Sequence, residues 1–210
     1  MLQGCGVRYL GFPLRLPVHR EDLSEGEAAA IIKTLAPPVF AVLITYLERA
    51  SEIAAFCDGL GARIVQLHGD IQRDELKRLK ILDPNLTVIK SLVVGMGDHK
   101  ALEAMLRQLS PFVDAFIADT FDPNTGASGA TGKTHDWRVS RRLVEVADRP
   151  VILAGGLTPE NVKRAILEVR PAGVDSHTGV EDSSGRKSRE KVEKFLSEAH
   201  EAFEIVKARY

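Results

Sequence analysis

Short apolar runs alternate with longer stretches of helical periodicity along the whole chain. The apolar runs are rich in β-branched and aromatic residues and predict seven strands, at Tyr9–Phe12, Val39–Thr45, Ile64–Leu67, Val88–Val94, Ala115–Asp119, Val151–Ala154 and Gly173–Asp175. The stretch that follows each run predicts a helix, at Ser24–Leu35, Arg49–Leu60, Arg73–Leu82, His99–Ser110, Arg138–Ala147, Pro159–Val169 and Ser188–Lys207. Thr158 and Pro159 are typical of a helix start, with threonine as the cap and proline in the first turn.

This alternation predicts a parallel sheet with helices outside it, either as an open doubly wound sheet or as a closed barrel. The residues that follow the strands favour the barrel. Polar residues and glycines end nearly every strand, at Gln66–Asp70, Ala118–Thr120, Ala154–Thr158 and Asp175–Gly179. In barrels of the triosephosphate isomerase type, the site is assembled from many strand ends, and the last two loops often hold phosphate. We therefore expect one (β/α)-barrel domain over residues 1–210.

The composition narrows the class of partner. Lys plus Arg number 28 and Asp plus Glu number 29, so the chain has no basic excess that would attract nucleic acid or an anionic membrane. Apolar runs such as Val39–Thr45 are far shorter than the roughly 18 residues of a membrane helix. Cys5 and Cys57 are too few for a disulfide framework or a zinc site built from thiols. We expect a soluble cytoplasmic protein with a small-molecule partner.

The segment Asp119–Trp137 carries the strongest chemical signal, because a strand that ends in an acid leads into a small-residue loop closed by Gly-Lys-Thr. A nucleotide P-loop would need glycine five positions before Gly132, where this chain has Ala127. The strand also ends well before the loop. The irregular stretch Asp122–Gly132 is the one long insertion between predicted elements, and such loops are usually functional. We expect a phosphorylated small molecule as the substrate rather than ATP.

Four segments together resemble the phosphoribosylanthranilate isomerase family, the barrel enzymes of tryptophan biosynthesis that perform an Amadori rearrangement. They are VQLHGD, GATGKTHDW, LAGGLTPENV and GVDSHTGVEDSSG, in the order and spacing of that family. The stretch LGFPLRLPVHRED is similar to the second strand of the family and the loop after it. The resemblance covers the chain from about Gly11 to its end.

The resemblance implies a role for each matching residue. Asp119 matches the general acid, which protonates the ribose ring oxygen and opens the ring to a Schiff base. Arg20 matches the arginine that anchors the anthranilate carboxylate. The phosphate-binding positions of the family correspond to Gly155, Gly156, Thr178 and Gly179. Because the implied reaction is an internal proton transfer, no metal or organic cofactor is expected.

The family's first strand, which ends in Lys-Ile-Cys-Gly with the cysteine that removes the C2′ proton, has no counterpart in this sequence. The resemblance therefore implies seven βα units and a missing first unit. Three explanations stay open: a start codon assigned too late, a protein that runs naturally on seven units, or a neighbouring subunit that covers the gap. Cys5 precedes the match to the second strand, so it falls at the wrong end of the barrel and is expected to be an ordinary small apolar residue. A barrel of seven units has open strand edges, which favours a homo-oligomer.

His177 is the candidate for the missing base, because it stands where the family usually has serine and because histidine titrates near neutral pH. The alternative is that His177 only hydrogen-bonds the phosphate. Lys133 could contact the substrate or order its own loop. The runs Glu181–Ser184 and Arg186–Lys191 are expected to be a solvated turn and a helix start.

Two other functions stay open at this point. One is a related phosphosugar isomerase with a different substrate, in which His177 supplies the missing base. The other is a catalytically silent protein that binds a phosphorylated ligand. The barrel fold does not separate these alternatives, because it carries many chemistries.

Overall fold

The computed structural model describes residues 1–17, 21–95, 99–122, 127–128 and 134–208. The chain divides into two compact units. The first, called the N-unit, comprises Arg8–Ser91 and Gln108–Ala115. The second, called the C-unit, comprises Met1–Val7, Leu92–Arg107 and Phe116–Tyr210. The chain passes between the units after Val7 and again within β4 (Thr87–Val94), α4 (His99–Leu109) and β5 (Ala115–Asp122).

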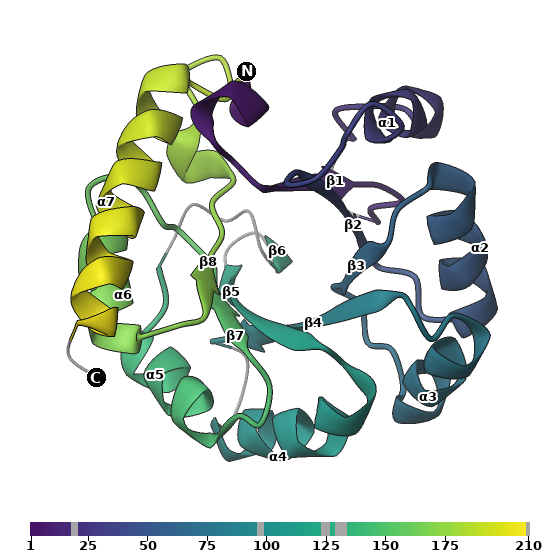
Figure 1. Ribbon diagram of the computed structural model, residues 1–210. Helices are drawn as coiled ribbons and strands as arrows, with labels where there is room; N and C mark the ends of the chain where they lie inside the picture. The colour runs from purple at the N-terminus through teal and green to yellow at the C-terminus, as the bar shows by residue number, and fades with distance from the viewer. Residues whose placement is uncertain (18–20, 96–98, 123–126, 129–133, 209–210) are drawn as a thin grey trace. The chain divides into compact units, whose positions relative to one another are not determined.

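The N-unit is a parallel sheet with helices along one face. Its strands β1 (Tyr9–Pro13), β2 (Phe40–Thr45), β3 (Ile64–Leu67) and the first part of β4 pair in sequence order. Val65 and Leu67 of β3 are fully buried, as is Val88 of β4, and this burial matches the mainly apolar sequence of these strands. Figure 1 shows α1 (Glu25–Ile32), α2 (Ala50–Leu60) and α3 (Arg73–Leu82) on the same side of these strands. A short 3₁₀ helix, η2 (Ser110–Phe112), completes the unit.

Two local signals fix the helix ends in the N-unit. Ser24 and Glu27 form a reciprocal capping box at the start of α1, in which each side chain accepts a hydrogen bond from the backbone N–H of the other residue. Gly61 ends α2 in the left-handed conformation, with φ of 77°, and its N–H bonds back to the last turn.

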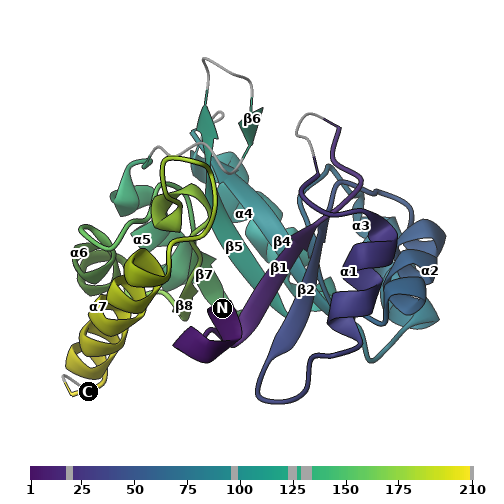
Figure 2. The same ribbon diagram turned by 90° about the horizontal axis from the view of Figure 1, so that it is seen from above.

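The C-unit repeats the same strand–helix pattern. The strands β5 (Ala115–Asp122), β7 (Val151–Leu153) and β8 (Gly173–Val174) are parallel. The helices that follow them are α5 (Trp137–Val146), α6 (Val162–Val169) and α7 (Arg189–Lys207), and the short 3₁₀ helix η3 (Thr178–Val180) lies between β8 and α7. Figures 1 and 2 show α6 and α7 side by side.

The core of the C-unit lies between these helices and strands. It includes Trp137, Leu153, Ile166 and Phe195, all buried. The 3₁₀ helix η1 (Leu2–Cys5) contacts α7, and its residues Leu2 and Cys5 pack against this core together with Val7. Cys5 Sγ also lies 3.8 Å from the guanidinium of Arg189 on α7.

The structure changes the predicted elements at three places. β5 continues past Asp119 to Asp122 and pairs with a short antiparallel strand, β6 (Ala127–Ser128), inside the stretch predicted to be irregular (Figure 2). The helix expected from Pro159 begins at Val162, because residues 159–161 form a turn in which the N–H groups of Asn161 and Val162 both bond to the carbonyl oxygen of Thr158. The runs Glu181–Ser184 and Arg186–Lys191 are not only a solvated turn, because Glu181 and Lys187 form an ion pair in which both side chains are mostly buried. No helix among the described residues is both long and apolar enough to span a membrane.

Candidate functional site

The strand ends of the C-unit form a polar pocket. Asp119 belongs to β5, Gly155 follows β7, and Asp175 follows β8. The carboxyl ends of parallel strands lie at one edge of the sheet, which brings these segments together. The residues that line the pocket are Asp119, Gly155, Gly156, Leu157, Asp175, Ser176, His177, Thr178 and Gly179. Six of the seven predicted site residues are therefore in one place, and the seventh, Arg20, lies outside the described residues, as does Lys133.

Asp119 lines this pocket with only 7% of its surface exposed. Its Oδ1 accepts a hydrogen bond of 2.7 Å from the backbone N–H of Thr120. A carboxyl group held by its own strand in this way has a defined orientation, which a proton donor to a bound sugar needs.

The turn after β7 requires glycine. Gly155 and Gly156 have φ of 85° and 62°, in the left-handed region that side chains disfavour. A β-carbon on Gly155 would lie 1.9 Å from Thr120 Oγ1, so the side chain of the neighbouring strand fills that space. The side chain of Asn161 holds the turn from the other side, because its amide donates to Gly156 O (2.9 Å) and accepts from Thr158 N–H (2.8 Å).

The loop after β8 packs directly against the turn after β7. The hydroxyl of Ser176 donates to the carbonyl oxygen of Leu157 at 2.7 Å. A β-carbon on Gly179 would lie 1.9 Å from the same oxygen, so a side chain at this position would separate the loops. The two glycine-containing segments therefore form one continuous backbone surface within the C-unit.

His177 stands at the rim of the pocket with 40% of its side chain exposed. Its Nδ1 lies 3.3 Å from Oε1 of Glu181. Lys187 contacts the same carboxylate and donates to the carbonyl oxygen of His177 at 3.1 Å. Sequence reasoning missed Glu181 and Lys187, because in the sequence they belong to a charged stretch that is typical of a solvated turn.

A second group that the sequence did not reveal lies next to Asp119. The ring of His135 is bracketed by two hydroxyl groups, with Thr120 Oγ1 at 2.8 Å from Nδ1 and Ser140 Oγ at 2.5 Å from Nε2. Burial lowers the pKa of His135 to about 4, against the opposing effect of Asp119 and Asp136. The imidazole is therefore neutral at pH 7.

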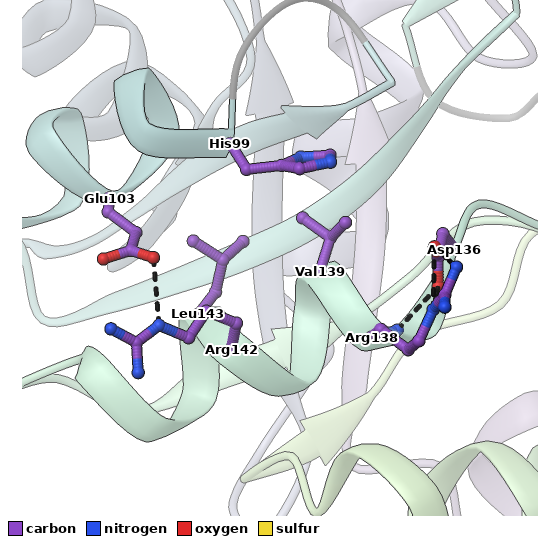
Figure 3. Close-up of a pocket in the computed structure, with 7 residues that line it drawn as sticks. All are labelled: His99, Glu103, Asp136, Arg138, Val139, Arg142 and Leu143. Atoms are coloured by element: carbon purple, nitrogen blue, oxygen red, sulfur yellow. Dashed lines mark hydrogen bonds and ion pairs between the residues drawn. The ribbon is translucent and has the colours of Figure 1, made fainter.

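A larger hollow of about 300 Å³ lies elsewhere in the C-unit, between α4 and α5. Figure 3 shows that its charged side chains point toward one another in pairs. Arg142 Nε lies 3.0 Å from Glu103, and Arg138 Nη2 lies 2.7 Å from Asp136. The hydrogen bonds from Arg138 lower the pKa of Asp136 to about 2. Because the charges cancel within these pairs, this hollow has no excess of positive charge for a phosphate group.

The pocket at the strand ends offers one buried carboxyl group, a histidine beside an acid, and two segments of glycine-rich backbone. These groups suit proton transfer on a small anionic substrate. Within the part of the chain that the structure describes, no three His, Cys, Asp or Glu side chains cluster closely enough to hold a metal ion.

The comparisons with known proteins point to the same chemistry. The model of the N-(5′-phosphoribosyl)anthranilate (PRA) isomerase family matches residues 16–198. The chain belongs to the phosphoribosylanthranilate isomerase family. N-(5′-phosphoribosyl)anthranilate isomerase 2 of Methanosarcina mazei is 39% identical over 204 residues, which cover 95% of this chain and 87% of that protein.

Solved structures of this isomerase agree with the assignment. The phosphoribosylanthranilate isomerase of Thermotoga maritima superposes with a TM-score of 0.79 at 29% identity, over 95% of this chain and 91% of that one. A phosphoribosylanthranilate isomerase in complex with reduced 1-(o-carboxyphenylamino)-1-deoxyribulose 5-phosphate gives a TM-score of 0.76 at 27% identity, with the same coverage. The predicted (β/α)-barrel class, the family and the assignment to an isomerase of tryptophan biosynthesis are thereby confirmed.

Proposed function

We propose that this member of the family converts N-(5′-phosphoribosyl)anthranilate to the carboxyphenylamino-deoxyribulose phosphate at the strand-end pocket of the C-unit. The observation that carries this proposal is that Asp119 and the two glycine-containing loops line one pocket. The backbone N–H groups of Gly155, Gly156, Thr178 and Gly179 bind the phosphate. No side chain at the glycine positions obstructs the approach of the ligand to the backbone.

The chemistry begins at Asp119. Its carboxyl group donates a proton to the ribose ring oxygen, the bond between that oxygen and C1′ breaks, and the nitrogen lone pair forms the iminium. A base then removes the proton from C2′, and the electrons of that C–H bond neutralise the iminium nitrogen to give the enol form of the enamine. Transfer of the C2′ hydroxyl proton to C1′ then yields the ketone, and the proton held by the base replaces the one that Asp119 gave to the ring oxygen. Atoms and charges balance without a cofactor.

We infer that His177 is the base. The carboxylate of Glu181 lies 3.3 Å from its Nδ1, where its negative charge would stabilise the imidazolium that forms when Nε2 takes the proton. The competing role is that Nε2 donates a hydrogen bond to the phosphate. Lys187 supports either role, because it holds both Glu181 and the backbone of His177. Arg20 is proposed to bind the anthranilate carboxylate, on the family resemblance alone.

Turnover of phosphoribosylanthranilate, followed as loss of anthranilate fluorescence, tests the proposal. Asp119→Asn should abolish turnover without weakening the binding of inorganic phosphate, because the amide keeps the shape of the carboxyl group but cannot donate a proton to the ring oxygen. His177→Gln keeps a hydrogen-bond donor near the position of Nε2 but takes up no proton. Loss of kcat in His177→Gln supports the base, and retained kcat assigns His177 to the phosphate.

The same assay distinguishes the other functions. Wild-type protein that binds inorganic phosphate without converting phosphoribosylanthranilate would be a silent binding protein. Conversion of an aminoribose phosphate that lacks the aromatic acid would indicate a related isomerase with another substrate. We also propose that the protein is a cytoplasmic homo-oligomer. We expect it to bind no nucleic acid, because its net charge is −1. Sedimentation velocity measures the oligomeric state directly.

A further inference from the structure

His135 bonds to neutral side chains through both of its ring nitrogens. Thr120 Oγ1 lies 2.8 Å from Nδ1, and Ser140 Oγ lies 2.5 Å from Nε2. Thr120 is 3% exposed and Ser140 is fully buried. A neutral imidazole has one donor and one acceptor, and each hydroxyl can rotate to match it, so both bonds form at once.

Thr120 connects this histidine to the proposed site in two ways. Its backbone N–H donates to Asp119 Oδ1 at 2.7 Å. Its hydroxyl oxygen lies 1.9 Å from the position that a β-carbon on Gly155 would take, so the side chain packs tightly against the phosphate-binding turn. A rotation of the Thr120 side chain would therefore press on Gly155 and shift the peptide that orients Asp119.

We propose that His135 is a positioning residue that holds Thr120 in one rotamer, and through Thr120 fixes both the Asp119 carboxyl group and the Gly155 turn. This role rests on the proposed function of that pocket. His135 does not face the pocket itself, since it is absent from the lining residues. Its effect on the reaction is transmitted by one hydroxyl group.

The two ring nitrogens allow a matched pair of variants. His135→Asn places an amide group near the position of Nδ1 and keeps the bond to Thr120, whereas His135→Gln reaches the position of Nε2 and keeps the bond to Ser140. Each variant loses one hydrogen bond, so their melting temperatures should fall by similar amounts. We expect kcat/KM for phosphoribosylanthranilate to fall about tenfold in His135→Gln and to be largely retained in His135→Asn. Equal activity of the two variants would overturn the proposal.

A second variant tests whether the effect passes through Thr120. Thr120→Val removes the hydroxyl and keeps the shape of the side chain. If His135 acts through this hydroxyl, the double variant His135→Gln/Thr120→Val should lose no more than Thr120→Val alone, within about twofold. Losses that multiply would contradict the proposal, because the two residues would then act independently.

Affinity for inorganic phosphate separates failure of this role from failure of the proposed function. If the wild-type protein does not convert phosphoribosylanthranilate, this result contradicts the isomerase function but not the role of His135. In that case, calorimetry on the same matched pair decides the role of His135. Phosphate binding that is at least about threefold weaker in His135→Gln than in His135→Asn supports it, because Thr120 then still shapes the Gly155 turn. Equal affinity overturns it.

Discussion

The hydroxyl oxygen of Thr120 occupies the place where a β-carbon on Gly155 would lie, with a separation of only 1.9 Å. Two constraints therefore act on Gly155 at once. The first is its left-handed φ of 85°, which any side chain would strain, and the second is the contact with Thr120. The contact with Thr120 is a feature of the phosphate-binding turn. A left-handed φ also occurs at glycines in other turns of the C-unit, such as Gly185.

Gly155→Ala should abolish turnover and weaken the binding of inorganic phosphate, because the turn must move away from Thr120. Gly185→Ala is the matched control, since Gly185 has φ of 79° but no atom within 4 Å of the place that a β-carbon would take. It should cost only the φ strain, about 1 kcal/mol of stability, and leave phosphate affinity unchanged. Calorimetry and thermal unfolding of both variants measure the difference. Equal phosphate affinities would show that the contact with Thr120 is unimportant.

The pKa of His135 predicts acid sensitivity. Burial lowers it from 6.5 to about 4, so between these values the unfolded chain binds a proton that the folded chain does not. The stability should therefore fall as the pH drops from 6.5 to 4, by up to about 3 kcal/mol. Urea unfolding at intervals across this range measures the slope. In His135→Asn the unfolded chain no longer binds this proton, so the stability should fall less steeply with decreasing pH. An unchanged slope would contradict the lowered pKa of His135.

Lys90 should oppose folding at neutral pH. The residue is 4% exposed, and burial lowers its pKa to about 8, although Asp70 and Glu48 act in the other direction. Below pH 8 the Lys90 ammonium group is charged in both the folded and the unfolded protein, so the cost of burying the charge lowers the stability by its full amount. Between pH 8 and 10.5 the folded chain has lost the proton and the unfolded chain has not, so the stability should rise with pH.

Replacing Lys90 by methionine should remove this cost. The hydrogen bond that Nζ donates to the carbonyl oxygen of Ser91 is lost in the same variant, and this loss offsets part of the gain. We therefore expect the free energy of unfolding of Lys90→Met to be higher by about 1 to 2 kcal/mol at pH 7. Lys77→Met, on an exposed position of α3, is the control and should change the stability by less than about 0.5 kcal/mol. Destabilisation by Lys90→Met in urea unfolding would show that the ammonium group is well stabilised where it lies.

The two thiols should react very differently. Cys57 is 1% exposed, and burial raises its pKa to about 12, whereas Cys5 is partly exposed. Iodoacetamide should therefore label Cys5 in the folded protein and Cys57 only in urea. Because Cys5 packs against the core of the C-unit, away from the pocket lining, Cys5→Ala should keep wild-type turnover. Mass spectrometry identifies the labelled thiol, and loss of activity in Cys5→Ala would restore Cys5 as a candidate base.

The longer strands could be predicted from the sequence because they are mainly apolar runs, and in β2, β3 and β4 most of these residues are buried. β6 could not be predicted, since it has only two residues and forms only because β5 extends past Asp119 to Asp122 and pairs with it. The glycines of the site were predicted from the family resemblance. The physical reason at Gly155 is the packing of Thr120, and that contact depends on the register of β5 with β7.

The sequence did not predict the contacts of side chains whose partners lie on other elements. Glu181 and Lys187 belong to a stretch whose composition is typical of a solvated turn, but a bridge between these two residues folds it back beneath His177. His135 precedes an ordinary helix cap at Asp136. Only the strand register and the first turn of α5 bring Thr120 and Ser140 to its two nitrogens.

The packing of η1 on α7 has a consequence for the order of synthesis and folding. Leu2 and Val7 contact a core that includes Val192 and Phe195, so they leave the ribosome long before their partners exist. The strands of the N-unit from β1 to β3 are all made in between. A nascent chain can therefore pair these strands early, while closure of the C-unit waits for the last helix and sets the slow, long-range step of folding.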